Sequence, residues 1–302
     1  MNFELLIDDF DVSQFERVFE LFSSYFEVSD KLLSVGYLEW LYLTNPYGHA
    51  KVVRVLDGDR WIGFMAMIPI ELAKRESRLL AYYVVNVLVH PDYHGKNIFG
   101  KMIAAAKEFV RHEGSALMGH PNDMALKSWK RAEMHFHESL SPYLVVPRIL
   151  SGGASVKVVT HVDDLRSVVS ELDVQLRSAE TWNVAITADY INWRYLANPV
   201  NSYLVQLLDV NGTSVGFSVS KKVRSGVSLL VDRFMLESHA EDGFSKLPWL
   251  TVYFRSKMLK RELIGGFLPV PVRKKIPFFL TCYEKPFLNF EVVKIGLSAS
   301  DF

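Results

Sequence analysis

A polar turn between an apolar run and an amphipathic helix is the part of this sequence best suited to chemistry. The apolar run ends at Val89, and the turn and first helical residues that follow read HPDYHGKNIFG. The first N–H groups of a helix have no partner within it, and its dipole is positive at that end. A helix that begins after a small polar loop can therefore hold a phosphate or a pyrophosphate. The turn predicts an anion site at the start of this helix.

Histidines supply the next candidate groups. His90 and His94 lie four residues apart, and His135 and His137 lie two apart, so a metal site has to be weighed. No carboxylate-histidine motif of the HExxH kind accompanies them, so we interpret them as surface histidines and predict no metal. His120 follows a predicted short strand and is a candidate catalytic base, with a structural or solvent-facing histidine as the alternative.

Asn86 and two aromatic segments also invite a functional interpretation. On the predicted central strand, Asn86 either orders a catalytic water or pairs with neighbouring backbone. The pairs Trp40/Tyr42 and Trp193/Tyr195 could stack on a ligand, but their recurrence along the chain favours core packing.

The elements that position these residues follow from hydrophobic period and turn residues. A strand is predicted over Tyr83–Val89, because it is rich in β-branched and aromatic residues and Pro91 ends it. A helix follows, because apolar residues recur every three or four positions from Ile98 to Phe109. The other predicted elements of the first half are strands at 3–7, 51–56, 61–68, 115–119 and 143–149 and helices at 12–26 and 123–131.

An internal repeat divides the chain. Residues 37–46 read YLEWLYLTNP and residues 190–199 read YINWRYLANP, with six of ten positions identical, and a helix and a hairpin flank both segments. We predict two homologous domains, 1–150 and 156–302, joined by a linker at 151–155. The second copy has no comparable glycine-lysine turn, so it is predicted to pack, to shape a cleft or to bind a partner.

Composition excludes several classes of protein. Of the 302 residues, 49% are hydrophobic, so we expect a globular protein. The 34 basic residues balance 34 acidic ones, so the chain lacks the excess positive charge that non-specific nucleic-acid binding needs. Neither a signal peptide nor a run of about 18 apolar residues occurs, so we expect no membrane span and a cytoplasmic location. The single cysteine, Cys282, excludes an intramolecular disulfide and lies in a predicted apolar strand, 278–283.

Together these segments resemble a known family. HPDYHGKNIFGKMI after NVLV resembles the acyl-CoA-binding segment of the GNAT N-acetyltransferase superfamily, and GHPNDMALKSWKR is similar to that family's next strand, asparagine and helix. The Trp-x-Tyr-x-x-Asn-Pro segments resemble those of bacterial GNAT proteins, some of them tandem. The resemblance implies an α/β (α+β) fold of two tandem GNAT-like domains, each a mixed, mainly antiparallel twisted sheet flanked by helices.

The resemblance also implies roles for particular residues. Backbone groups of Val87, Leu88 and Val89 would hold the pantetheine, and Asn122 would lie near the cofactor arm. The pyrophosphate would be held by His94, Gly95, Lys96, Asn97, Ile98, Phe99 and Gly100. Three of these, His94, Asn97 and Phe99, depart from the family signature. Asparagine tolerates the left-handed backbone that glycine usually supplies, whereas phenylalanine adds bulk beside the pyrophosphate path.

Trp129 stands where the family often has a tyrosine that protonates the leaving thiolate. Indole does no acid chemistry near neutral pH, so no acid can be assigned from the sequence.

The leading hypothesis is an acyl-CoA-dependent N-acyltransferase that transfers acetyl from acetyl-CoA, or another acyl group, to an amine. The alternative is a non-catalytic pseudoenzyme or a CoA- or ligand-binding module with the same fold. A nucleotide-phosphate binder of another kind is weaker, because no Walker or dinucleotide fingerprint is present. The acceptor stays open among small-molecule amines, and a monomer or homodimer is expected.

Overall fold

The computed structural model describes residues 3–28, 30–145, 154–178, 182–239, 250–255, 267–269 and 276–282. The helices and strands of its first half are β1 (Glu4–Asp9), α1 (Phe15–Phe22), α2 (Val35–Leu43), β2 (Lys51–Asp57), β3 (Arg60–Lys74), β4 (Ser77–Val89), α3 (Ile98–His112), β5 (Ala116–Gly119), α4 (Asp123–Arg131) and β6 (Phe136–Val145). Strands β1 to β4 pair antiparallel in sequence order, and β5 joins β4 in parallel.

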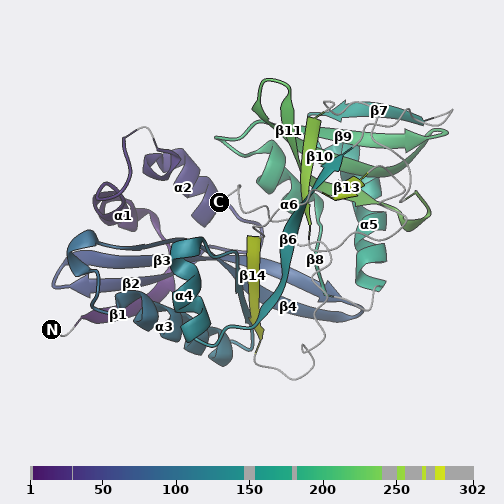
Figure 1. The fold of residues 1–302 in the computed structure, drawn as a ribbon. Helices are drawn as coiled ribbons and strands as arrows, with labels where there is room; N and C mark the ends of the chain where they lie inside the picture. The colour runs from purple at the N-terminus through teal and green to yellow at the C-terminus, as the bar shows by residue number, and fades with distance from the viewer. Residues whose placement is uncertain are drawn as a thin grey trace.

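Helices cover both faces of this sheet (Figure 1). One buried cluster joins α1 and α2 to alternate residues of β3 to β5, including Tyr83 and Met118. The other cluster joins α3 and α4 to the strand residues that alternate with those of the first cluster, including Tyr82 and Leu117. The period-two alternation of a strand thus separates an α1/α2 face from an α3/α4 face.

The first half confirms most predicted elements and corrects the bounds of four. The strand predicted over Tyr83–Val89 is β4, which begins earlier, at Ser77. The helix predicted over 12–26 is shorter: α1 ends at Phe22, and Val12 is 67% exposed. The strand predicted at 61–68 runs on to Lys74 and turns directly into β4. The strand predicted at 143–149 is β6, which begins earlier, at Phe136, and residues 146–149 lie outside the described residues.

The helices and strands of the second half are β7 (Ala154–Val159), α5 (Arg166–Ser178), β8 (Asn183–Val184), α6 (Ala188–Ile191), β9 (Tyr203–Val210), β10 (Thr213–Arg224), β11 (Val227–Met235), β12 (Leu250–Arg255), β13 (Phe267–Pro269) and β14 (Ile276–Cys282), with a π-helical turn, η5 (Asn192–Leu196), after α6. From β7 to β11 the second half follows the order of the first from β1 to β4, namely strand, helix, helix and three strands, with the short strand β8 added. Asn211 and Gly212 both have positive φ, as a two-residue hairpin turn requires, so the predicted hairpin is confirmed.

The two halves exchange strands. β14, from the end of the chain, pairs antiparallel with β5 and with the first part of β6. The second part of β6, Ser141–Val145, pairs with β12 and β13 of the second half. A single continuous order of strands results, β1-β2-β3-β4-β5-β14-β6-β12-β11-β10-β9-β7. Each half therefore supplies a strand to the other's sheet.

Tryptophans of the repeated segments bind each other across the same boundary. The indole N–H of Trp40 donates to the carbonyl of Trp193 at 2.7 Å, and the indole N–H of Trp193 donates to the carbonyl of Trp40 at 2.9 Å. Their rings stack with centroids 5.2 Å apart. Reciprocal contacts between equivalent residues are the pattern of a two-fold-related pair. The core-packing interpretation of the aromatic segments is confirmed, since Trp40, Tyr42, Trp193 and Tyr195 are all buried.

None of the helices in the described ranges is long and apolar enough to cross a membrane. The linker predicted at 151–155 falls mostly outside those ranges, and β7 already begins at Ala154. The domain limits 1–150 and 156–302 remain a prediction. The exchanged strands show that the sheets do not divide at the same place as the predicted domains.

The strand exchange predicts that neither half folds alone. A fragment of residues 1–150 lacks β14, so β5 and β6 would expose unpaired edges. We expect no cooperative thermal transition for this fragment or for residues 151–302, and recovery of one when the two are co-expressed. Circular dichroism and calorimetry measure this. A fragment 1–150 that melts cooperatively as a monomer would contradict it.

Candidate active site

The site begins where β4 and β5 separate. Their parallel pairing covers only Ala81–Tyr83 against Ala116–Met118, while the other edge of β4 pairs with β3 as far as Val89. Along residues 84–89 the edge of β4 that faces β5 therefore has no neighbouring strand among the described residues. The register of β3 and β4 shifts between Phe64 and Ala66, and Asn86 at this bulge has a φ of +49°. Asparagine is among the few residues that adopt this conformation readily.

A cavity of about 720 Å³ occupies the gap. It is lined by Tyr25, residues 83–89, His94, Phe99, residues 119–122, Met124, Ala125 and Trp129. Tyr83 and Val85 belong to the α1/α2 face, whereas Phe99 and Trp129 belong to the α3/α4 face. The cavity is thus lined from both faces of the sheet.

The polar turn closes one end of the cavity and leads into α3. Gly95 has a φ of +80° and Asn97 a φ of +56°, so Asn97 does adopt the left-handed conformation expected of it. A Cβ on Gly100 would meet the side-chain amide of Asn97, which would have to move. The N–H groups of the first turn of α3 have no partner within the helix. The turn therefore offers N–H groups to an anion, and the open edge of β4 offers backbone groups to an extended chain.

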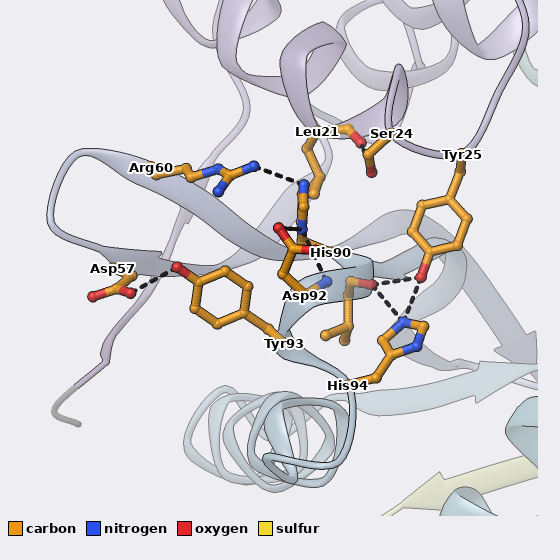
Figure 2. Close-up of polar contacts among 10 residues, drawn as sticks. Leu21, Ser24, Tyr25, Asp57, Arg60, His90, Asp92, Tyr93 and His94 are labelled. Carbon is orange, nitrogen blue, oxygen red and sulfur yellow. Dashed lines mark hydrogen bonds and ion pairs between the residues drawn. The ribbon is translucent and has the colours of Figure 1, made fainter.

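Two neighbouring elements anchor the turn (Figure 2). From the β2–β3 hairpin, Asp57 accepts a hydrogen bond from the Tyr93 hydroxyl at 2.7 Å, and Arg60 lies 2.8 Å from His90 Nε2. After the end of α1, the Tyr25 hydroxyl lies 2.5 Å from His94 Nε2 and donates to the Val89 carbonyl at 2.6 Å.

The paired histidines do not converge on a metal. His90 contacts Arg60 of the hairpin, while His94 contacts Tyr25 and the Val89 carbonyl, so the two rings serve different neighbours (Figure 2). Among residues 3–28, 30–145 and the other described ranges, no group of three or more His, Cys, Asp or Glu side chains is placed to hold a metal ion. The side chain of His137 lies outside what the structure describes.

His120 lies at the end of β5 and reaches the cavity. Its Nδ1 is 2.7 Å from the hydroxyl of Tyr83, and both side chains are on the α1/α2 face. Burial disfavours the charged imidazolium and lowers the pKa of His120 to about 4. The ring is therefore neutral at pH 7, as a base must be before it accepts a proton.

Asn86 contacts a residue that the sequence did not indicate. Its side-chain amide donates a hydrogen bond to the buried Tyr42 hydroxyl at 2.7 Å. Burial raises the pKa of Tyr42 far above its usual value, so this phenol stays protonated. The pair holds the bulge of β4 against α2.

Asn122 and Trp129 lie on the wall of the cavity. The Asn122 side chain caps α4 by accepting from the N–H of Ala125 at 2.9 Å. Trp129 is 2% exposed and packs edge-to-face on Phe99, with ring centroids 5.7 Å apart. Phe99 thus meets Trp129 between α3 and α4.

Sequence reasoning missed Tyr25 and Tyr83. No sequence pattern indicated Tyr25, because it lies in the loop after α1. Its contact with His94 depends on the folding of two distant segments against each other. Tyr83 had a partial signal: strand alternation puts it two positions from Val85 on one face, but its pairing beside Met118 needed the register of β4 and β5.

The lowered pKa of His120 predicts how stability depends on pH. An unfolded histidine has a pKa near 6.5, so the unfolded chain binds more protons than the folded one between pH 4 and 6.5. The stability that neutral His120 supports is therefore complete above pH 6.5 and is lost as the pH falls to 4, with a slope of at most about 1.4 kcal/mol per pH unit. Denaturant unfolding at several pH values should show this slope in the difference between the wild type and His120→Gln. A difference that is constant with pH would contradict the assignment.

Comparisons with known proteins bear on the whole chain. Residues 7–124 match the family model of the acetyltransferase (GNAT) domain. No curated protein sequence matches this chain. A probable N-acyltransferase of unknown function from Enterococcus faecalis has a similar structure, with a TM-score of 0.68 and 11% identity over 92% of this chain and 73% of that one. A GCN5-related N-acetyltransferase from Anabaena variabilis has a TM-score of 0.64 and 12% identity, over 92% and 72% of the chains.

A tandem GNAT protein from the clavulanic acid biosynthesis pathway is similar over nearly its full length. It has a TM-score of 0.56 and 13% identity, over 92% of this chain and 98% of that one. At these identities the solved structures show the fold alone, and they show it across both halves. Residues 7–124 thus belong to the GNAT family of acetyltransferase domains, and the chain as a whole has the fold of tandem GNAT proteins.

Proposed function

We propose that this protein is an acyl-CoA-dependent N-acyltransferase that acylates a small-molecule amine, with acetyl-CoA as the simplest donor. One observation carries the proposal. A cavity is lined from both faces of the sheet, at the open edge of β4 and beside the N-terminus of α3. A donor on one face and an acceptor on the other can meet in such a cavity.

The α3/α4 face suits the donor. The left-handed residues Gly95 and Asn97 shape the turn, and the start of α3 offers N–H groups to a pyrophosphate. A groove of about 630 Å³ between α3 and α4 continues from Asn97 and Gly100. Its charged lining residues are three cations and one carboxylate, Lys107, Arg111, Arg131 and Glu108. This balance favours the anionic adenosine end of CoA.

The open edge of β4 suits the middle of the donor. Backbone N–H and C=O groups along 84–89 can form ladder-like hydrogen bonds with the amides of a pantetheine arm. The bound acyl-CoA would supply a thioester, whose carbonyl carbon an amine attacks. Phe99 and Trp129 provide an apolar wall beside it.

The α1/α2 face suits the acceptor. His120 lines the cavity on this face and is neutral at pH 7, so we assign to it the proton of an attacking amine. Its low pKa also makes the protonated ring a strong acid, which can pass the proton on to a leaving thiolate. One histidine would then serve both steps, and the tyrosine absent at Trp129 would not be needed. The second half would help to shape the acceptor cleft.

A non-catalytic binding module is the second candidate. The observation in its favour is that Tyr25 and His94 both bond the Val89 carbonyl, on the edge that a donor would use, while Trp129 fills the place of the expected acid. Thiol release distinguishes the two. A panel of amines that yields none, although acetyl-CoA binds, would favour the module.

Gly95→Glu tests donor binding. A side chain at φ +80° strains the turn, and a carboxylate repels phosphate, so acetyl-CoA affinity should fall at least tenfold by calorimetric titration. Gly226→Glu is the matched control, because Gly226 has a φ of +73° and equal open space in the second half. It should leave affinity unchanged. No wild-type binding at millimolar acetyl-CoA would overturn the proposal.

A further inference from the structure

We propose that the side chain of Tyr25 is a latch on the open edge of β4. In the free protein its hydroxyl occupies the backbone carbonyl of Val89, and an acyl-CoA that binds along this edge has to displace it. The inference rests on the proposed donor binding and adds to it a contact that limits access to the site. The latch connects the segment after α1 to the last residue of β4, where the polar turn begins.

The carbonyl of Val89 points toward the open edge. Val89 lies opposite Gly63 of β3, and at the next position the N–H of His90 donates to the carbonyl of Ile62 at 2.8 Å. In an antiparallel pair, successive residues direct their backbone groups alternately toward the partner strand and away from it. Since His90 directs its N–H toward β3, Val89 directs its N–H and C=O away from β3. Val89 therefore offers its carbonyl on the edge that borders the cavity.

Two side chains already bind this carbonyl in the free protein (Figure 2). The Tyr25 hydroxyl donates to it at 2.6 Å, and Nε2 of His94 lies 2.9 Å from it. Because a carbonyl oxygen can only accept, the histidine donates through its Nε2–H. A carbonyl oxygen has two lone pairs, so neither is left for an amide N–H of an extended donor. One of the two side chains has to leave before the donor can bond there.

Tyr25 is the side chain that can leave. His94 is only five residues from Val89 and belongs to the turn itself, whereas Tyr25 comes from a distant segment. Tyr25 is 44% exposed and belongs to neither of the two buried clusters that pack on the sheet of the first half. Its ring also borders a second hollow of about 570 Å³, lined by Tyr25, Phe26, Glu27, Asp30 and Lys31. The ring can therefore rotate out of the cavity without disturbing the core.

The latch lowers the affinity for the donor in a defined way. A ligand that binds only the open form has an apparent affinity reduced by the fraction of molecules that are open. The hydrogen bond from Tyr25 to Val89 stabilises the closed form, so its removal should raise the open fraction and the affinity together. A residue that contacted the bound donor would have the opposite effect when truncated. The sign of the change therefore distinguishes a latch from a binding residue.

Tyr25→Phe keeps the ring and removes the hydroxyl that donates to Val89. Calorimetric titration should show a gain in acetyl-CoA affinity of about fivefold, which corresponds to about 1 kcal/mol, the usual net contribution of one hydrogen bond. Tyr47→Phe is the matched control, because the Tyr47 hydroxyl also donates to a backbone carbonyl, that of Ala185 at 2.7 Å, and Tyr47 does not line the cavity. It should leave the affinity unchanged.

An affinity that falls or stays constant in Tyr25→Phe would overturn the inference. Hydrogen–deuterium exchange of the ligand-free protein reads the latch separately from donor binding. Peptides covering residues 23–28 should exchange faster in Tyr25→Phe than in the wild type, with no change in Tyr47→Phe, and equal exchange would also overturn the inference. Failure of the wild type to bind millimolar acetyl-CoA would count against the proposed function, and the exchange of the free protein would then decide whether Tyr25 holds the edge.

Discussion

The architecture of the site depends on a single constraint, the end of the β4–β5 ladder after three residues. The bulge at Asn86 directs β4 away from β5. The hydrogen bond from Asn86 to the buried Tyr42 holds the bulge in place. Backbone groups inside a protein need partners, so an open strand edge on a cavity is a surface prepared for an extended ligand. The second half has a similar design: among the described residues, β11 pairs with β12 over residues 227–230, and Tyr195 donates a hydrogen bond to Asp232.

Exchanged strands connect the two halves that the sequence predicts to be homologous copies. β5 pairs with β4 on one edge and with β14 on the other. β6 pairs with β14 in its first part and with β12 of the second half in its last part. At the centre the Trp40 and Trp193 indoles satisfy each other's backbone carbonyls. Buried carbonyls without such partners would cost about 1 to 3 kcal/mol each. The second half therefore supports the cavity of the first through the strand next to β5.

Local sequence patterns predicted most helices and strands of the fold. They did not predict which strands pair when the strands are far apart in the sequence. Hydrophobic period and turn residues located α3, α4 and both hairpins, and the repeat pointed to two similar halves. The preference of asparagine for left-handed angles anticipated Asn97. Nothing local marks a strand at 276–282 as belonging beside β5, since sheet partners depend on distant contacts. For the same reason the sequence indicated His120 but not Tyr83, and it indicated Asn86 but not Tyr42.

Hydrogen–deuterium exchange with acetyl-CoA tests the central claim, that a donor lies along the open edge of β4. On ligand addition, slower exchange is expected in peptides covering residues 84–89 and 95–100, with no change over the equivalent strand, Val227–Met235. Because the amides on the open edge have no strand partner in the described part of the free protein, their protection would report direct hydrogen bonding to the donor. Protection confined to the second half, or none at saturating acetyl-CoA, would contradict the account.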